Sequence, residues 1–182
     1  PMVHVLPQWT WPGKEGETIR FEAYSNCDEV ELFVNGVSQE RKRHERGKIS
    51  AWNLTYEPGT LRAVGYRNGA EAAFELHETA GEPDHIELRC VYDGEEQKLI
   101  QARVTDKEGR LCPHSCVPIR FEAEGGKIIG VGNGDPACHE PDISDSRTSF
   151  NGLALCIVEK TAEKLYVKAY SEQIGAGEYC TE

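Results

Sequence analysis

Apolar and polar residues alternate in short runs along most of the chain, a period of two that is typical of half-buried β-strands. Two neighbouring runs are separated by Asn35-Gly36 and another two by Asn68-Gly69. Both pairs predict tight hairpin turns, because a type I′ turn needs positive φ at its two central positions. The alternating runs cover residues 19–23, 30–34, 52–56, 61–66, 72–76, 86–90, 100–104, 119–123, 154–158 and 165–169. No helical period is convincing in the first half, and the pattern predicts an all-β protein.

A short polar segment, Thr79–Asp84, interrupts the pattern near the middle of the chain. It is punctuated by Gly and Pro, and the strand pattern restarts after it at Ile86. The length of 182 residues suits two domains of roughly equal size. Short strands with regularly spaced turn signals are typical of sandwiches. The sequence therefore predicts two tandem immunoglobulin-like β-sandwich domains, residues 1–81 and 82–182.

The charge balance excludes some partners. The formal net charge is −11, from 31 acidic and 20 basic residues, which disfavours binding to nucleic acid or to an anionic membrane surface. No apolar run approaches the roughly 20 residues that cross a bilayer, and no signal peptide is recognisable. The basic stretch 41–46 is expected to be a solvated loop or an edge strand. Because the sequence begins at Pro1, we expect it to be a piece of a longer chain.

The seven cysteines are odd in number and irregularly spaced, which disfavours a disulfide framework. Cys90 and Cys156 are separated by about the interval of an immunoglobulin bridge, but every tryptophan precedes Cys90, so the usual intervening core tryptophan is missing. Several cysteines occupy alternating apolar positions, where a free thiol behaves as a small hydrophobe. We therefore expect a reducing, cytoplasmic compartment.

Residues 130–151 form the longest polar interruption between apolar runs. Rich in Gly, Pro and Asp, this segment is expected to be neither helix nor regular strand, and long loops of this kind are usually functional or disordered. Its acidic and imidazole side chains include Asp135, His139, Glu140, Asp142 and Asp145. They do not follow the EF-hand spacing, and a glycosidase carboxylate pair needs more rigid elements. The main expectation is a loop that bonds to itself or to a neighbouring domain.

Other motifs for chemistry are weak or missing. The chain has no nucleophile elbow, zinc-protease, P-loop or dinucleotide signature. The glycine-rich run 130–134 is not followed by a helix that could bind phosphate. Cys112-Pro113-His114-Ser115-Cys116 lacks the second ligand pair that structural zinc normally uses. We predict no catalytic residue, metal or cofactor in this chain.

The aromatic residues Trp9, Trp11, Trp52 and Tyr56 offer flat apolar faces that suit sugar rings. Trp9 and Trp11 share parity on an extended segment, so both are expected on one face. Capping of the first core and contact with another domain are equally open alternatives.

Several ordered motifs resemble a known family. LPQWTWPGKEG (6–16), DEVELFVNG (28–36), YEPGTL (56–61) and AVGY (63–66) resemble the β-sandwich domain that follows the catalytic barrel in many bacterial glycoside hydrolase family 2 enzymes, usually β-galactosidases. The second half resembles their next domain, through TAGEP (79–83), GVGNGDP (130–136), HEP (139–141), Arg147 and FNGLA (150–154). Cys138 departs from the Ser or Thr that is frequent in that loop.

The resemblance implies a non-catalytic C-terminal fragment of a retaining glycosidase. In the family, the acid/base and the nucleophile are glutamates on a (β/α)₈ barrel of about 250 residues, which this chain is too short to contain. The implied partner is that barrel, with Trp9, Trp11 and the 130–151 loop, including Asp135, His139, Glu140 and Arg147, as candidate contacts. The alternative is a carbohydrate-binding module that uses Trp9, Trp11, Trp52 or the same loop.

Overall fold

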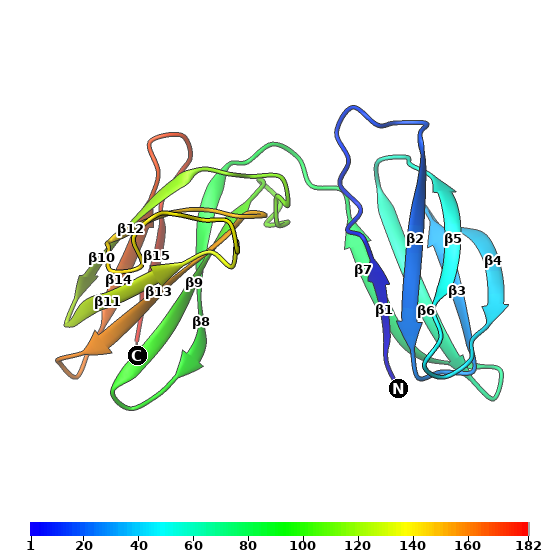
Figure 1. Ribbon diagram of the computed structural model, residues 1–182, viewed down its shortest axis with the longest axis horizontal. Coiled ribbons are helices and arrows are strands. Elements are labelled where there is room, and N and C mark those ends of the chain that lie inside the picture. Colours follow the sequence, from blue (N-terminus) through cyan, green and yellow to red (C-terminus); the bar gives the residue numbers. More distant parts are fainter. Residues whose placement is uncertain (182) are drawn as a thin grey trace. The chain divides into compact units, whose positions relative to one another are not determined.

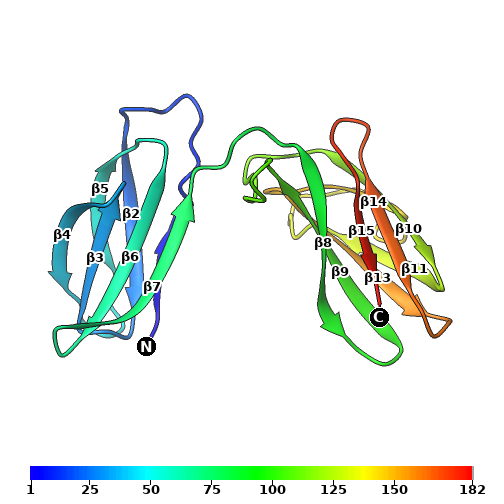
Figure 2. The same ribbon diagram turned by 180° about the vertical axis from the view of Figure 1, so that it is seen from behind.

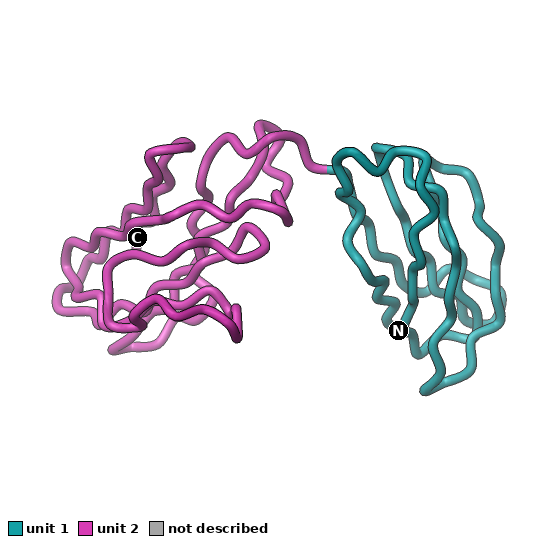
Figure 3. The backbone as a smooth tube through the Cα atoms, turned by 45° about the horizontal axis from the view of Figure 1, so that its top comes forward, with its two compact units in different colours: residues 1–79 teal, residues 80–182 magenta. Residues whose placement is uncertain are grey.

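A computed structural model describes residues 1–181, which contain fifteen β-strands and no helix, and therefore no helix able to cross a membrane. The chain divides into two compact units, with the division between Thr79 and Ala80 (Figure 3). This is two residues earlier than the predicted boundary. Ala80 is buried in the second core, and the amide of Gly81 donates to the carboxylate of Asp106 in the second unit.

The first unit is a sandwich of one three-stranded and one four-stranded sheet (Figure 1). In sheet order these are β1 (Val3–Leu6), β2 (Thr18–Ser25), β5 (Ser50–Thr55), and β4 (Val37–Arg43), β3 (Glu29–Val34), β6 (Thr60–Arg67), β7 (Ala70–Glu78). All pairings are antiparallel. The first residues of the basic stretch belong to β4, which is an edge strand of its sheet. This is one of the two alternatives that the sequence predicted.

Alternation along these strands builds the first core. Phe21 and Ala23 on β2 and Val30 and Leu32 on β3 are fully buried, as period-two burial requires. The two predicted hairpins are present, with φ values of 49° and 81° at Asn35-Gly36 and 51° and 80° at Asn68-Gly69.

The second unit is a sandwich of two four-stranded sheets (Figure 2). In sheet order these are β11 (Gly126–Gly132), β13 (Leu153–Lys160), β9 (Gln97–Thr105), β8 (His85–Asp93), and β12 (Ser146–Thr148), β10 (Pro118–Glu124), β14 (Tyr166–Tyr170), β15 (Gly177–Cys180). The β8-β9-β13-β11 and β10-β14-β15 pairings match the ABED and CFG sheets of an immunoglobulin constant domain, with β12 added at one edge.

The segment 130–151 is more regular than the sequence indicated. The expectation that it holds no regular strand is wrong at both ends, since β11 continues to Gly132 and β12 covers Ser146–Thr148. Gly130 and Gly132 are paired in register with Ile157 and Leu155 on β13, so the ladder tolerates these glycines. The longer irregular part is residues 133–145, which we call the acidic loop, and a short turn follows β12 at residues 149–151.

Candidate functional site

Arg147 on β12 holds the acidic loop against the edge of β11. Its side chain is 2% exposed, and its guanidinium donates to Val131 O at 3.0 Å, Pro141 O at 3.2 Å and Asp142 Oδ1 at 2.6 Å. It also lies 3.0 Å from Cys138 Sγ. The amide of Val131 donates to Asp142 O at 2.8 Å, so both backbone groups of Val131 that face away from β13 are bound by this network. The loop thereby covers an edge strand that would otherwise be open to pairing.

The other carboxylates of the acidic loop are bound by loop backbone, by Thr148 on β12 or by Arg120 on β10. Glu140 accepts from the amide and the hydroxyl of Thr148, and Asp135 accepts from the amide of Ala137 at 2.9 Å. The Thr148 hydrogen bonds are the main reason that the pKa of Glu140 lies below its ordinary value. Asp145 pairs with exposed Arg120 at 3.2 Å. The Glu140 and Asp135 contacts lie within residues 130–151 and agree with the expectation of a loop that bonds to itself, whereas the Asp145 pair joins it to β10.

The arrangement offers little to a cation or to a substrate. Asp142 points its oxygen at Arg147 although its side chain is 87% exposed, and His139 is exposed. Among residues 1–181, no group of three or more His, Cys, Asp or Glu side chains is placed to hold a metal ion. Both oxygens of Glu140 and one oxygen each of Asp135 and Asp142 are engaged by backbone amides, a hydroxyl or a guanidinium.

The tryptophans are less exposed than a stacking surface requires. Trp9 is 1% exposed, with its ring centroid 5.1 Å from those of both Phe21 and Tyr56, and its Nε1 donates to Glu57 O. Trp52 is 4% exposed and donates to Glu40 O. Neither ring is exposed for stacking on a sugar, and capping of the first core, one of the two alternatives left open for Trp9, describes its position.

Trp11 is the exception among the three. It is half-buried, packs on the edge of the first core and has the ammonium of Lys14 5.3 Å from its ring centroid. Trp9 and Trp11 do not share an exposed face, because Trp9 is buried and the segment from Pro7 to Glu17 that carries both is not a regular strand.

All seven cysteines are free thiols. Cys90 and Cys156 lie on β8 and β13, the two strands that flank β9, and both are in register with Ile100. Two strand spacings, roughly 10 Å, separate them, which is too far for a disulfide. In the Cys112–Cys116 motif one thiol is buried and the other exposed, and burial raises the pKa of Cys112 to about 11. The two thiols therefore face different environments.

Asp106 is a buried carboxylate that belongs to none of the sequence motifs. It is 1% exposed, accepts from the amides of Gly81 and Arg110 at 2.7 and 2.8 Å, and pairs with the Arg110 guanidinium at 2.8 Å. Burial by itself would raise its pKa, but these hydrogen bonds and the Arg110 charge together lower it. Asp106 fixes the first residues of the second unit, a structural role that only the fold reveals.

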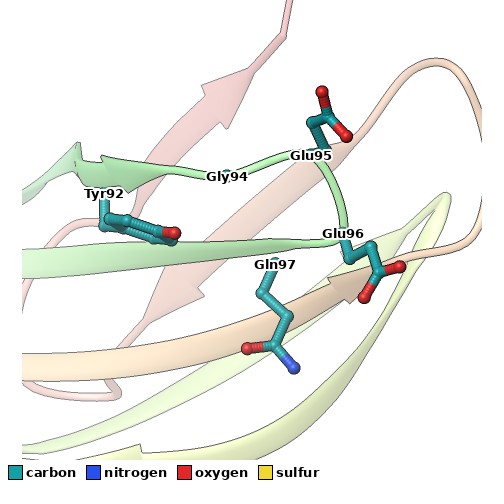
Figure 4. A pocket seen from close by; sticks show the side chains of 5 residues that line it. All are labelled: Tyr92, Gly94, Glu95, Glu96 and Gln97. Atoms are coloured by element: carbon teal, nitrogen blue, oxygen red, sulfur yellow. The ribbon is translucent and has the colours of Figure 1, made fainter.

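The surface hollows are shallow. One of about 350 Å³ lies at the β8–β9 turn, where Figure 4 shows the side chains of Glu95, Glu96 and Gln97 diverging. Another, of about 270 Å³, lies beside the acidic loop and is lined by Gln101, Gly132, Asn133, Gly134, Leu153, Ala154 and Leu155. Neither collects converging charged groups of the kind that perform catalysis.

Each of the two units matches a known domain family. Residues 82–179 match the family described as glycoside hydrolase family 2 C-terminal domain 5, and residues 16–73 match a domain of unknown function, DUF4982. The chain is 34% identical over 166 residues to the beta-galactosidase BoGH2A of Bacteroides ovatus, covering 87% of this chain and 19% of that protein. It is also 34% identical to a putative beta-glucuronidase of Formosa agariphila, of which it covers 16%.

A solved structure shares the fold of both units. A beta-glycosidase from Bacteroides vulgatus superposes with a TM-score of 0.93 at 32% identity, covering 100% of this chain and 24% of that one. The chain thus spans about a fifth of the length of the curated relatives it matches.

Proposed function

The chain belongs to glycoside hydrolase family 2, and from this premise we propose that it is a non-catalytic C-terminal part of a β-galactosidase-like, retaining glycosidase. Its two sandwiches support the catalytic domain through domain–domain contacts. The observation that carries the proposal is the match of nearly the whole chain to a small share of much longer glycosidases.

The internal chemistry is consistent with a supporting role. A retaining glycosidase needs two carboxyl groups about 5 Å apart that both face the substrate. In the acidic loop, Glu140 accepts hydrogen bonds from Thr148, Asp142 accepts from Arg147, and Asp135 accepts from the local backbone. The tryptophans do not favour the carbohydrate-binding alternative, because two of the three, Trp9 and Trp52, are buried and cannot stack on a sugar ring.

The test is a pair of assays with chromogenic β-galactoside and β-glucuronide substrates, on this chain and on the full-length natural protein. We expect turnover by the full-length protein and none by this chain. Turnover by this chain, abolished by Glu140→Gln, would make the acidic loop an active site and overturn the proposal. Inactivity of the full-length protein on both substrates would overturn the assignment of its activity.

The cytoplasmic location remains an expectation. Seven free thiols are compatible with it, and fractionation of the native organism with an antibody against this chain would test it.

A further inference from the structure

Strand β13 is apolar on both of its faces. It reads Leu153-Ala154-Leu155-Cys156-Ile157-Val158, a run of six apolar residues, so the expected alternation of apolar and polar residues over 154–158 is wrong. Ala154, Cys156 and Val158 point into the second core and are at most 2% exposed, so the other three point outward. An antiparallel strand with one wet face normally alternates apolar and polar residues, while a continuous apolar run is typical of a strand covered on both sides. Within the second unit, the opposite sheet covers the inner face of β13, while the residues of its outer face stay partly exposed.

On the neighbouring strand β9 the outer face is mixed, because Leu99 is apolar while Gln101 and Arg103, in register with Leu155 and Leu153, are polar. Leu99 on β9 is in register with Ile157, and on the other side Gly130 and Gly132 of β11 are in register with Ile157 and Leu155. The glycines leave a trough beside Leu155, part of which is the hollow of about 270 Å³ beside the acidic loop. A Cβ atom added at Gly132 would meet nothing within 4 Å. The trough is thus open space next to apolar side chains.

Arg103 adds an unsatisfied donor to the same face. It is in register with Leu153 and Glu87, and its side chain is 22% exposed. Its Nε is buried and has no hydrogen-bond partner among residues 1–181, with the Glu87 carboxylate 3.9 Å away. A buried polar group without a partner costs about 1–3 kcal/mol, so native structures usually supply one. An acceptor from outside the described chain would meet this need.

We propose that the outer face of the β11-β13-β9-β8 sheet, which we call the β13 face, is the surface on which the rest of the parent glycosidase, its catalytic domain, packs. This rests on the proposed function and deepens it by naming the contact. The matching surface of the catalytic domain is apolar where it meets Leu155 and Ile157, and it carries a carbonyl or carboxylate acceptor for Arg103.

A tethered domain suits this face better than a second copy of the chain. Leu99, Leu153, Leu155 and Ile157 are all half-buried already, so each has limited area left to cover. A stable interface between free proteins covers about 800 Å² per partner. Tethered domains can associate through a smaller buried area, because their linkage gives an effective concentration on the order of millimolar. About four fifths of each curated relative lies outside the matched region, which provides such a neighbour.

Hydroxyl-radical footprinting of the full-length natural protein and of this chain tests the assignment. We expect oxidation of Leu153, Leu155 and Ile157 to be at least fivefold slower in the full-length protein, at a ratio independent of protein concentration. The key variant is Gly132→Leu, whose Cβ atom meets nothing within 4 Å, and the matched control is Lys168→Leu, on β14 of the other sheet. Gly132→Leu should remove the protection and leave the melting temperature of this chain unchanged, and Lys168→Leu should keep the protection.

Three results would overturn the proposal. Equal oxidation rates in the two proteins would show that the face stays open. Protection that grows with the concentration of this chain would identify a second copy as the occupant, and protection of this chain by added galactosides would identify sugar. An active full-length glycosidase with an unprotected β13 face refutes only this inference, whereas an inactive full-length protein refutes the proposed function.

Discussion

Replacement of Arg147 by alanine is the sharpest test of how the acidic loop is held. The buried carbonyl of Val131 would lose its donor, a loss of about 1–3 kcal/mol. The emptied space of an almost fully buried side chain adds about 2 kcal/mol. The ion pair to Asp142 contributes little, about 0–1 kcal/mol, because that carboxylate is 87% exposed. We therefore expect Arg147→Ala to lower the free energy of unfolding of the second unit by about 3–5 kcal/mol, and its midpoint by about 12 °C or more.

The chain offers an internal reference for this measurement. All three tryptophans, Trp9, Trp11 and Trp52, are in the first unit, so tryptophan fluorescence follows that unit alone, while far-UV circular dichroism follows both. Arg147→Ala should shift a transition seen by circular dichroism and leave the fluorescence transition in place. The matched control is Arg120→Ala, which removes an exposed arginine from the adjacent strand and should change stability by less than about 1 kcal/mol. Equal effects of the two substitutions on stability would refute the conclusion that Arg147 holds the acidic loop in place.

Three further predictions concern buried groups. Because the folded-state pKa of Asp106 is lowered, its stabilisation is present above the unfolded-state pKa of about 4 and is lost as pH falls through the folded value. Asp106→Asn should therefore destabilise the second unit at pH 7 and matter progressively less in acid, as read by urea titrations; a constant difference would contradict this. Burial raises the pKa of Cys156 to about 12, so iodoacetamide at pH 8 should alkylate exposed Cys180 and spare Cys156, as mass spectrometry would show. Similar alkylation rates would show that the second core opens readily. Trp9→Ala should lower the stability of the first unit by about 3–5 kcal/mol, while Trp11→Ala, which changes a half-buried ring, should have a clearly smaller effect on the same denaturation curve.

The turn signals explain why the first unit was predictable from sequence. Asn35-Gly36 and Asn68-Gly69 predicted two hairpins, and the alternating residues just before each turn assigned the inward faces of β3 and β6. Local rules were sufficient because hairpins pair neighbouring segments.

The same local rules failed at β1, β11, β12 and β15. Neither the four-residue strand β1 nor the three-residue strand β12 is long enough to display a period, and β11 contains glycines that usually mark a loop. Strands β11 and β12 exist because a partner that is not their neighbour in sequence supplies the ladder, β13 for β11 and β10 for β12. Sequence could not provide that partner.

Taken alone, the sequence determined the fold class, the two-domain division to within two residues and, through ordered motifs, the family. These depend on periodicity, turn chemistry and residue order, which are local properties. Only the tertiary structure decided that Trp9 and Trp52 are core residues, that Arg147 clamps the acidic loop, and that β13 keeps a second apolar face open. Burial and hydrogen-bond satisfaction depend on which segments meet in space, and period-two alternation leaves this undetermined.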